Sequence, residues 1–253
     1  MNSVAKKKTE SEGGLYDTVK VIFQALLIAF VIRTFLFQPF NIPSASMVDT
    51  LLVGDYLFVS KYAYGYSQYS FPFGIVPIPG RVLGSSPDRG DIAVFKLPRD
   101  NKTDYIKRVM GLPGDRMQVK EGVVYINDVA VPREQMTDYV DIGFNGREIR
   151  ARRFRETLPN GVSYEVLDTE DNGRFDNTGV YVVPEGHYFM MGDNRDNSAD
   201  SRAKDAVGYV PYENFVGRAE VIFFSIREDT PIWQFWNWPT AVRWDRIFDS
   251  LRS

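Results

Sequence analysis

The sequence predicts an all-β fold, made of coiled antiparallel β-sheets or a partly open barrel with an inserted β subdomain, behind one N-terminal transmembrane helix. Three observations carry this prediction. One apolar segment near the N-terminus is long enough to span a bilayer. After Pro39, most of the chain consists of short runs rich in Val, Ile, Tyr and Phe, separated by Gly, Pro and Asn. Little helical periodicity lies between these runs, which favours antiparallel pairing.

The composition of the 253 residues excludes several classes of protein. With 44% hydrophobic and 25% charged residues, the chain has the composition of a globular protein and not of a disordered one. Its net charge of −3 gives no general attraction to nucleic acid, so we expect no nucleic-acid partner. There is no cysteine and a single histidine, His187. These counts exclude disulfides, thiolate nucleophiles and multi-histidine zinc sites, and we expect neither metal nor cofactor.

The predicted anchor covers residues 15–37. Its uninterrupted apolar stretch, residues 21–32, is only about 12 residues long, which is short of a bilayer span. Lys20 and Arg33 lie near its two ends, where their long side chains can reach the membrane interfaces. The whole segment therefore has the length and character of a transmembrane helix.

The flanking charges predict the orientation of this helix. Residues 1–14 are polar, without periodicity, and are expected to form a disordered cytoplasmic tail. They contain Lys6, Lys7 and Lys8, which place the N-terminus in the cytoplasm by the positive-inside rule. Two alternatives stay open: a cleavable signal peptide that ends near the small residues around Ser46, and a buried core helix.

The exported part is predicted to contain a β-domain in two parts, residues 38–128 and residues 180–253. A more polar inserted subdomain at residues 129–179 separates them. Turn signals such as Pro-Gly-Asp and Asn-Gly divide the β-like runs from one another. Strands are expected at residues 56–61, 92–96, 106–110, 116–120, 123–126, 180–183, 188–191 and 219–225.

Two further clusters each have a functional and a structural interpretation. Five arginines between residues 147 and 155 could contact anionic lipid, but Glu148 among them and Glu156 directly after them favour a solvated strand face. All four tryptophans lie between residues 233 and 244. They could form an interfacial membrane belt or the packed side of a terminal helix that begins at Thr240.

Small hydroxyl residues, Ser44 and Ser46, follow closely after the apolar segment. A serine needs a base to become nucleophilic. His187 has no motif around it and is expected to be a surface or packed residue, so a desolvated lysine is the natural substitute. Lys107, in a β-like run, is such a candidate, although a lysine on a solvent-exposed strand face would give the same sequence pattern.

Residues 192–202, GDNRDNSADSR, form the most polar stretch of the exported part. Their side chains can bind either a calcium-type cation or neighbouring backbone groups. Arg195 and Arg202 argue against a cation, so a rigid hydrogen-bonded scaffold is the preferred interpretation.

At these positions the sequence resembles bacterial type I signal (leader) peptidases, a family of membrane-anchored Ser/Lys endopeptidases. The resemblance covers the anchor and most of residues 38–128, resumes over about 182–227, and is poor over residues 129–179. The motif at residues 192–202 favours the Gram-negative type over the endoplasmic-reticulum type, in which a histidine replaces the lysine. The motifs, in family order, are IPSASM at residues 42–47 with Thr50-Leu51, GDIAVF at 90–95, YIKRV at 105–109 with GLPGD at 111–115, and GDNRDNSADSR at 192–202.

The resemblance implies roles for individual residues. Ser46 would be the nucleophile and Lys107 its general base. The Ser44 hydroxyl and the backbone N–H of Ser46 would form the oxyanion hole. Ser198 would form a hydrogen bond with Lys107 and fix its direction, next to a supporting ion pair between Asp200 and Arg202.

The resemblance also implies the substrate and the setting. Exported preproteins would be cut after Ala-X-Ala-like sites by an enzyme in the bacterial cytoplasmic membrane, with its catalytic domain on the outer, periplasmic side. The lipid bilayer and the export machinery are the further expected partners. Small apolar pockets would select the residues before the cut, and the candidates for their walls, each of which could equally be core, are Ile42, Met47, Leu51, Ile92, Val94 and Tyr105.

Two other classes of function are consistent with the same residues. A tethered, non-enzymatic β-domain could bind a ligand or a cell-wall component, in which case Ser46, Lys107 and Ser198 would be incidental. Another Ser/Lys hydrolase, of the self-cleaving repressor type or the pilus-processing type, would share the dyad. A repressor would lack the anchor, and specificity would separate the pilus-processing type.

Overall fold

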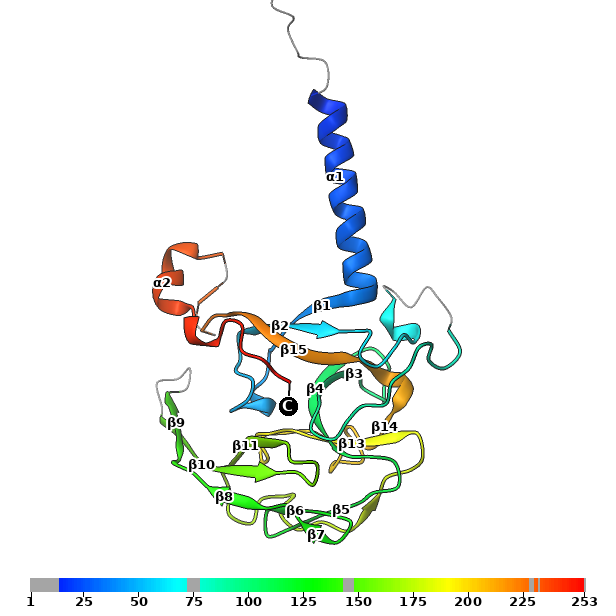
Figure 1. Cartoon of the computed structure of the whole chain (residues 1–253). Helices are drawn as coiled ribbons and strands as arrows, with labels where there is room; N and C mark the ends of the chain where they lie inside the picture. Colours follow the sequence, from blue (N-terminus) through cyan, green and yellow to red (C-terminus); the bar gives the residue numbers. More distant parts are fainter. Residues whose placement is uncertain (1–13, 72–77, 143–147, 228–229, 232, 253) are drawn as a thin grey trace, which may run out of the picture.

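The computed structural model describes residues 14–71, 78–142, 148–227, 230–231 and 233–252. A single helix stands clear of a body built almost entirely from β-strands (Figure 1). The prediction of an all-β fold with one N-terminal apolar helix is confirmed.

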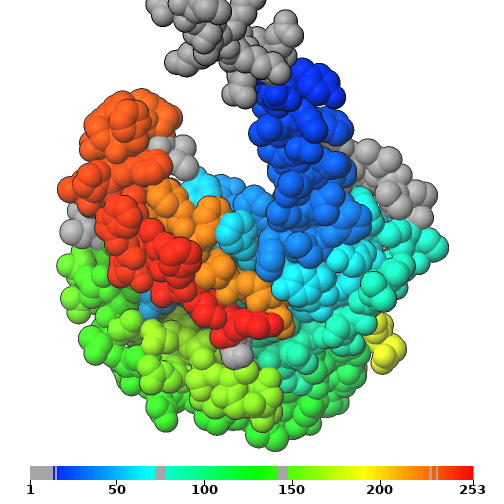
Figure 2. All heavy atoms as spheres, turned by 45° about the horizontal axis from the view of Figure 1, so that its top comes forward, coloured from blue at the N-terminus to red at the C-terminus, as the bar shows by residue number. Residues whose placement is uncertain are grey.

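The helix, α1 (Gly14–Val31), continues into a π-helical turn at Ile32–Leu36. The segment Tyr16–Leu36 contains 21 residues, has a mean hydropathy of 2.0, and is only 6% buried. A core helix would bury its apolar face, so this exposure argues against that alternative. Figure 2 shows the helix projecting from the body. The lysines that predict its orientation lie outside the described residues.

The main sheet has seven strands in the order β1-β2-β15-β3-β4-β13-β14, with antiparallel neighbours throughout. Register shifts in the pairs that β15 makes with β2 and β3 bend this long strand, and the sheet curls around it. The strands are β1 (Phe37–Asn41), β2 (Asp55–Ser60), β3 (Ile92–Lys96), β4 (Asp104–Gly111), β13 (His187–Met191), β14 (Val210–Pro211) and β15 (Phe215–Ser225).

Two smaller sheets lie at the other end of the body from α1 (Figure 1). One has the order β12-β5-β6-β7, and the other has the order β11-β10-β8 with β9 paired to β10. They contain β5 (Arg116–Lys120), β6 (Val123–Ile126), β7 (Val129–Ala130), β8 (Arg133–Gln135), β9 (Tyr139–Ile142), β10 (Glu148–Thr157), β11 (Ser163–Asp168) and β12 (Tyr181–Val182).

The predicted insert, residues 129–179, shares a hydrophobic core with the rest of the body. Side chains of the insert pack with side chains from β4, β5, β6 and β13 in one buried cluster. The insert is therefore fixed against the main β-domain. The cluster consists of Met110, Met117, Val119, Val124, Ile126, Val131, Leu158, Tyr164, Val166, Val183, Phe189 and Met191.

The C-terminal segment differs from the expected terminal helix. It forms a four-residue helix, α2 (Trp238–Ala241), and a 3₁₀ turn at Trp244–Arg246. Pro239 fits the first turn of α2, and the chain leaves the helix at Val242 to run beside β15. Figure 1 shows α2 on the same side of the body as α1, and Figure 2 shows the segment lying along β15. Trp233, Trp236 and Trp244 are exposed.

Candidate active site

Ser46 lies on a short 3₁₀ turn, Ala45–Met47, that follows the extended residue Ser44. The fully buried side chain of Met47 holds one side of the turn in the core. On the other side, Asn194 donates its backbone N–H to Ser46 O (3.2 Å) and its side-chain amide to Ala45 O (3.0 Å). The candidate nucleophile is thus held on a fixed turn.

Lys107 approaches this turn from β4. It lies within this strand, where successive side chains point to opposite faces, so Lys107 and Arg108 face opposite sides of the sheet. Lys107 Nζ donates hydrogen bonds to Ser46 Oγ at 2.7 Å and to Ile106 O at 2.8 Å. Its side chain is buried, so Lys107 does not lie on a solvent-exposed strand face, which was the alternative that periodicity left open.

Burial lowers the pKa of Lys107 from 10.5 to about 8, although the negative charges of Asp200 and Asp193 raise it in part. At pH 7 a lysine with this pKa is neutral in about one molecule in ten, against about one in three thousand at the ordinary value. The group can therefore accept a proton from a serine hydroxyl at a useful frequency.

Two other serines lie near the pair. Ser44 Oγ is 3.4 Å from Ser46 Oγ. Ser198 is buried in the same cleft, but among the described residues its hydroxyl makes no hydrogen bond of standard geometry, so the contact expected with Lys107 is absent. Lys107 instead uses the Ile106 carbonyl to fix its direction.

Gly192 permits the close approach of these groups. A Cβ atom at this position would lie 2.3 Å from Ser198 Oγ and 2.5 Å from Ser46 O. Neither contact is tolerable, so the absence of a side chain at Gly192 is a packing requirement of the site.

Residues 192–202 form a scaffold of ion pairs and backbone hydrogen bonds. Asp200 and Arg202 are both buried and lie 2.9 Å apart, and Asp200 also accepts the Gly192 N–H at 3.0 Å. Although burial raises the pKa of the Asp200 carboxyl, the adjacent Arg202 guanidinium lowers it below its usual range. The carboxylate is therefore ionised near Lys107.

A second pair, which sequence reasoning did not single out, links this scaffold to β4. Arg108 donates to both carboxylate oxygens of Asp193, at 2.9 and 2.7 Å, and Thr50 donates to Asp193 at 2.6 Å. Arg108 and Asp193 both fall inside the quoted motifs, which is the signal that could have identified them. In the part of the chain that the structure describes, no group of three or more histidine or carboxylate side chains is arranged to hold a metal ion.

A cleft of about 730 Å³ opens over Ser46 and Lys107. Of the six predicted wall residues, Tyr105 lines it, and the other five lie in the buried core below. Strand alternation cannot separate a pocket wall from the core directly beneath it. The lining residues are Pro43, Ser44, Ser46, Thr103, Asp104, Tyr105, Ile106, Lys107, Glu170, Arg174, Phe175, Asp196, Asn197, Ser198, Ala199, Ala203, Asp205 and Ala206.

Three of these lining residues, Glu170, Arg174 and Phe175, come from the predicted insert, and nothing in the sequence indicated them. His187 does not line the cleft; its Nδ1 lies 2.9 Å from Glu185 O at the start of β13. The structure therefore brings Ser44, Ser46, Lys107 and Ser198 together and leaves the histidine elsewhere.

The signal peptidase family, peptidase S26, matches residues 15–224 of this chain. The chain belongs to that family. It is a peptidase of this family, and the exposed apolar helix fits a membrane-anchored one.

Signal peptidases I of the genus Rickettsia are similar over nearly the whole chain. The protein of Rickettsia typhi is 44% identical over 243 residues, which cover 89% of this chain and 90% of that protein. The protein of Rickettsia conorii is 41% identical, with 89% of each covered. A crystal structure of a signal peptidase I from Enterococcus faecalis, 28% identical, covers 53% of this chain and 97% of that one, with a TM-score of 0.31.

Proposed function

We propose that this protein removes N-terminal signal peptides from exported preproteins, with Ser46 as the nucleophile and Lys107 as the general base. The observation that carries the proposal is the 2.7 Å hydrogen bond from Lys107 Nζ to Ser46 Oγ. The lysine is buried and makes neither of its two hydrogen bonds to a carboxylate, so its neutral form is accessible.

The reaction begins when neutral Lys107 takes the Ser46 proton as Oγ attacks the scissile carbonyl carbon. The Ser44 hydroxyl and the Ser46 backbone N–H stabilise the negative oxygen of the tetrahedral intermediate; loss of one such donor typically costs about 100- to 1,000-fold in rate. Lys107 then gives the proton to the leaving amine, which is the new N-terminus of the mature protein. Water attacks the Ser46 ester, Lys107 accepts the water proton, and the signal peptide leaves with a free carboxylate as Ser46 regains its hydrogen.

The substrate binds as an added strand. β4 pairs with β3 along residues 104–108, but β13 pairs with β4 only from Arg108 onward. The opposite edge of residues 104–107 has no strand partner among the described residues, and it borders the cleft. An extended peptide on this edge would present every second side chain to the enzyme, so small side chains one and three positions before the cut fit an Ala-X-Ala-like site.

The anchor sets the position of this reaction. Ser46 follows the end of the apolar span at Leu36 by a short segment, so the cleft lies close to the membrane surface from which cleavage sites emerge. We propose a single-pass protein of the bacterial cytoplasmic membrane, with residues 1–14 in the cytoplasm and residues 38–128, 129–179 and 180–253 on the periplasmic side. The bilayer is then a partner, and the export machinery is a further one.

The test is cleavage of a purified preprotein by the full-length protein in detergent micelles. The wild type should release the mature protein with the N-terminus after the Ala-X-Ala site, and Ser46→Ala should release none. Lack of cleavage by a folded wild type would favour a binding module. Cleavage that persists in Ser46→Ala would reject the assignment of the nucleophile.

A further inference from the structure

The turn that carries Ser46 rests, on its far side, against the predicted insert. Val48, two residues after Ser46, packs with Ala151 of β10 and Leu167 of β11, and all three are buried. Ala45 and Leu52 from the same loop and Tyr139 from β9 pack around them. This apolar cluster is separate from the larger core clusters, so it fixes the loop to the β10–β11 hairpin specifically.

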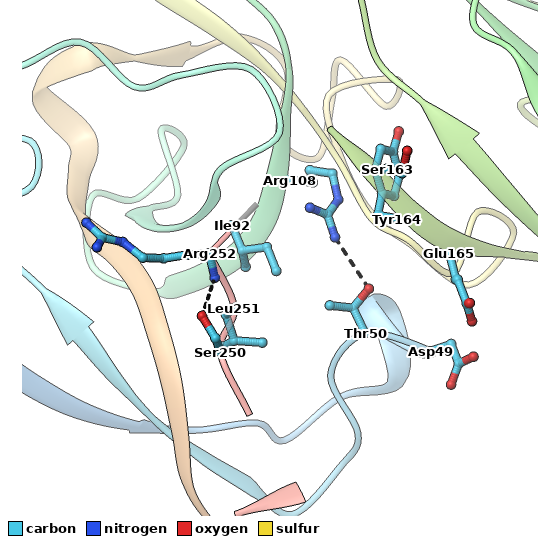
Figure 3. A pocket seen from close by; sticks show the side chains of 10 residues that line it. All are labelled: Asp49, Thr50, Ile92, Arg108, Ser163, Tyr164, Glu165, Ser250, Leu251 and Arg252. Carbon is cyan, nitrogen blue, oxygen red and sulfur yellow. Dashed lines mark hydrogen bonds between the residues drawn. The ribbon is translucent and has the colours of Figure 1, made fainter. Parts of the chain in front are cut away.

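Beside this apolar cluster, an ion pair also joins the loop that carries Ser46 to the β10–β11 hairpin. Asp49 lies 3.0 Å from Arg153 Nη1, on β10. Arg153 is itself held in place, because its Nε donates to Thr137 O at 3.0 Å and its Nη1 lies 3.4 Å from Glu165 on β11. Figure 3 shows Asp49 and Thr50 of this loop on the same side of the view as Tyr164 and Glu165, and all four residues line a pocket of about 290 Å³.

The same hairpin also holds the scaffold at residues 192–202. Leu167 donates its N–H to Asp193 O and accepts the Arg195 N–H, each at 2.9 Å. Arg195 in turn forms two hydrogen bonds to Glu156 of β10, at 2.8 and 2.5 Å. The hairpin therefore contacts both elements that flank the Ser46–Lys107 pair.

We propose that the β10–β11 hairpin of the insert is the support that sets the position of Ser46, and that Arg153 is a positioning residue that acts through Asp49. This inference rests on the proposed function of Ser46. Its physical basis is the sensitivity of catalysis to geometry: a displacement of reacting groups near 1 Å can cost about 100-fold in rate. Arg153 touches the rear of the loop and does not line the cleft, so its effect falls on the chemical step and not on substrate binding.

Arg153→Ala should lower kcat about three- to fivefold and leave KM unchanged, because a partly exposed ion pair makes a modest contribution. Arg153→Lys should recover most of the loss. Arg155→Ala is the matched control. Arg155 lies two residues along the same strand and pairs with Glu165 at 3.2 Å. Among the described residues it forms no ion pair with Asp49, so the kcat of Arg155→Ala should equal that of the wild type.

Charge reversal gives the sharper test. Arg153→Glu places a third carboxylate beside Asp49 and Glu165 and should lower kcat about tenfold. Adding Asp49→Arg exchanges the two charges and should restore most of the activity at an unchanged unfolding midpoint. Equal kcat in the Arg153→Ala and Arg155→Ala variants, a change in KM alone, or no recovery on charge exchange would overturn the inference.

These results are separable from a failure of the proposed function. If Ser46→Ala cleaves as well as the wild type, the nucleophile is misassigned. If Ser46→Ala is inactive and the Arg153 variants behave like Arg155→Ala, only the role of the insert is wrong.

Discussion

Lys107, the proposed base, lowers the stability of the folded protein. Its ammonium is buried without a contacting carboxylate, and burial lowers its pKa to about 8. At pH 7 the folded protein must hold a charge in the interior that the unfolded chain holds in water. The side chain that would serve as base thus opposes folding at neutral pH.

Replacing Lys107 by Met should therefore stabilise the protein at pH 7 while it removes the base. A pKa of about 8 in place of 10.5 corresponds to about 3 kcal/mol, an upper bound because the two hydrogen bonds are lost as well. The penalty is complete below pH 8, and it decreases between pH 8 and 10.5, where the native lysine is neutral and the unfolded one is still charged. Urea unfolding at pH 7 and pH 10.5 checks this; an advantage of Lys107→Met that is larger at the higher pH would contradict it.

Gly192 is the second residue at which geometry makes a definite prediction. Gly192→Ala drives a Cβ atom into Ser46 O and Ser198 Oγ, so the serine turn must shift and cleavage should fall at least about 100-fold. Gly179→Ala is the control, because a Cβ atom there has no heavy atom within 4 Å. The measurement is the rate of preprotein cleavage at equal concentrations of folded enzyme. Similar rates in the two variants would contradict the packing argument.

At the scale of the element, the proposed docking of the substrate on the edge of residues 104–107 in β4, which has no strand partner among the described residues, predicts substrate selection. A preprotein with Leu in place of the Ala immediately before the cut should resist cleavage, because its side chain points into the enzyme. The same replacement one residue further back should be tolerated, because that side chain points away from the sheet. Cleavage rates of the two altered preproteins test this alternation, and equal rates would exclude strand-like docking.

The elements that the sequence predicted well are those with strong local signals. Short runs with buried apolar residues between turn residues predicted β3, β5 and β6 at the observed bounds. β10 was expected only as a solvated strand face without bounds, because its arginines hide the alternation of a half-buried strand, and β11 was not predicted. Arg152, Arg153 and Arg155 pair with Asp168, Asp49 and Glu165, whose positions no local pattern reveals. Arg147, the first of that run, lies outside the described residues.

Among the residues of the candidate site, too, those with local sequence signals were predicted and those that depend on distant contacts were not. Motifs in family order predicted Ser46, Lys107 and residues 192–202 as candidates, because each motif is continuous in sequence. The contribution of the insert depends on contacts between residues about one hundred positions apart, such as Asp49 with Arg153. Only the folded chain shows those contacts. Lys107 takes the carbonyl of its neighbour Ile106 as its second hydrogen-bond partner and not Ser198, a choice that no sequence motif reveals.

At the scale of the molecule, the exposed aromatic lobe at the C-terminus lies on the same side of the body as the anchor (Figure 1). Trp233 and Trp236 are exposed next to Phe235, and aromatic side chains of this kind favour the membrane interface. We therefore expect the lobe to contact the bilayer and to hold the cleft at the membrane surface.

Tryptophan fluorescence of the full-length protein in vesicles tests this contact. Lipids brominated near the headgroup should quench the emission of the wild type strongly, and the Trp233→Ala/Trp236→Ala variant should lose most of that quenching. Equal fractional quenching in the two proteins would place the lobe in water.

If Lys107, and not His187, is the base that activates Ser46, the pH dependence of preprotein cleavage should follow the titration of the lysine. Since the neutral lysine is the active form, kcat should rise about tenfold per pH unit below pH 8 and level off above it. His187→Ala should reproduce this profile, and Lys107→Ala should be folded and nearly inactive at every pH. A wild-type rate that levels off at about pH 6.5, the ordinary pKa of a histidine, together with an inactive His187→Ala enzyme, would assign the role of base to His187 instead.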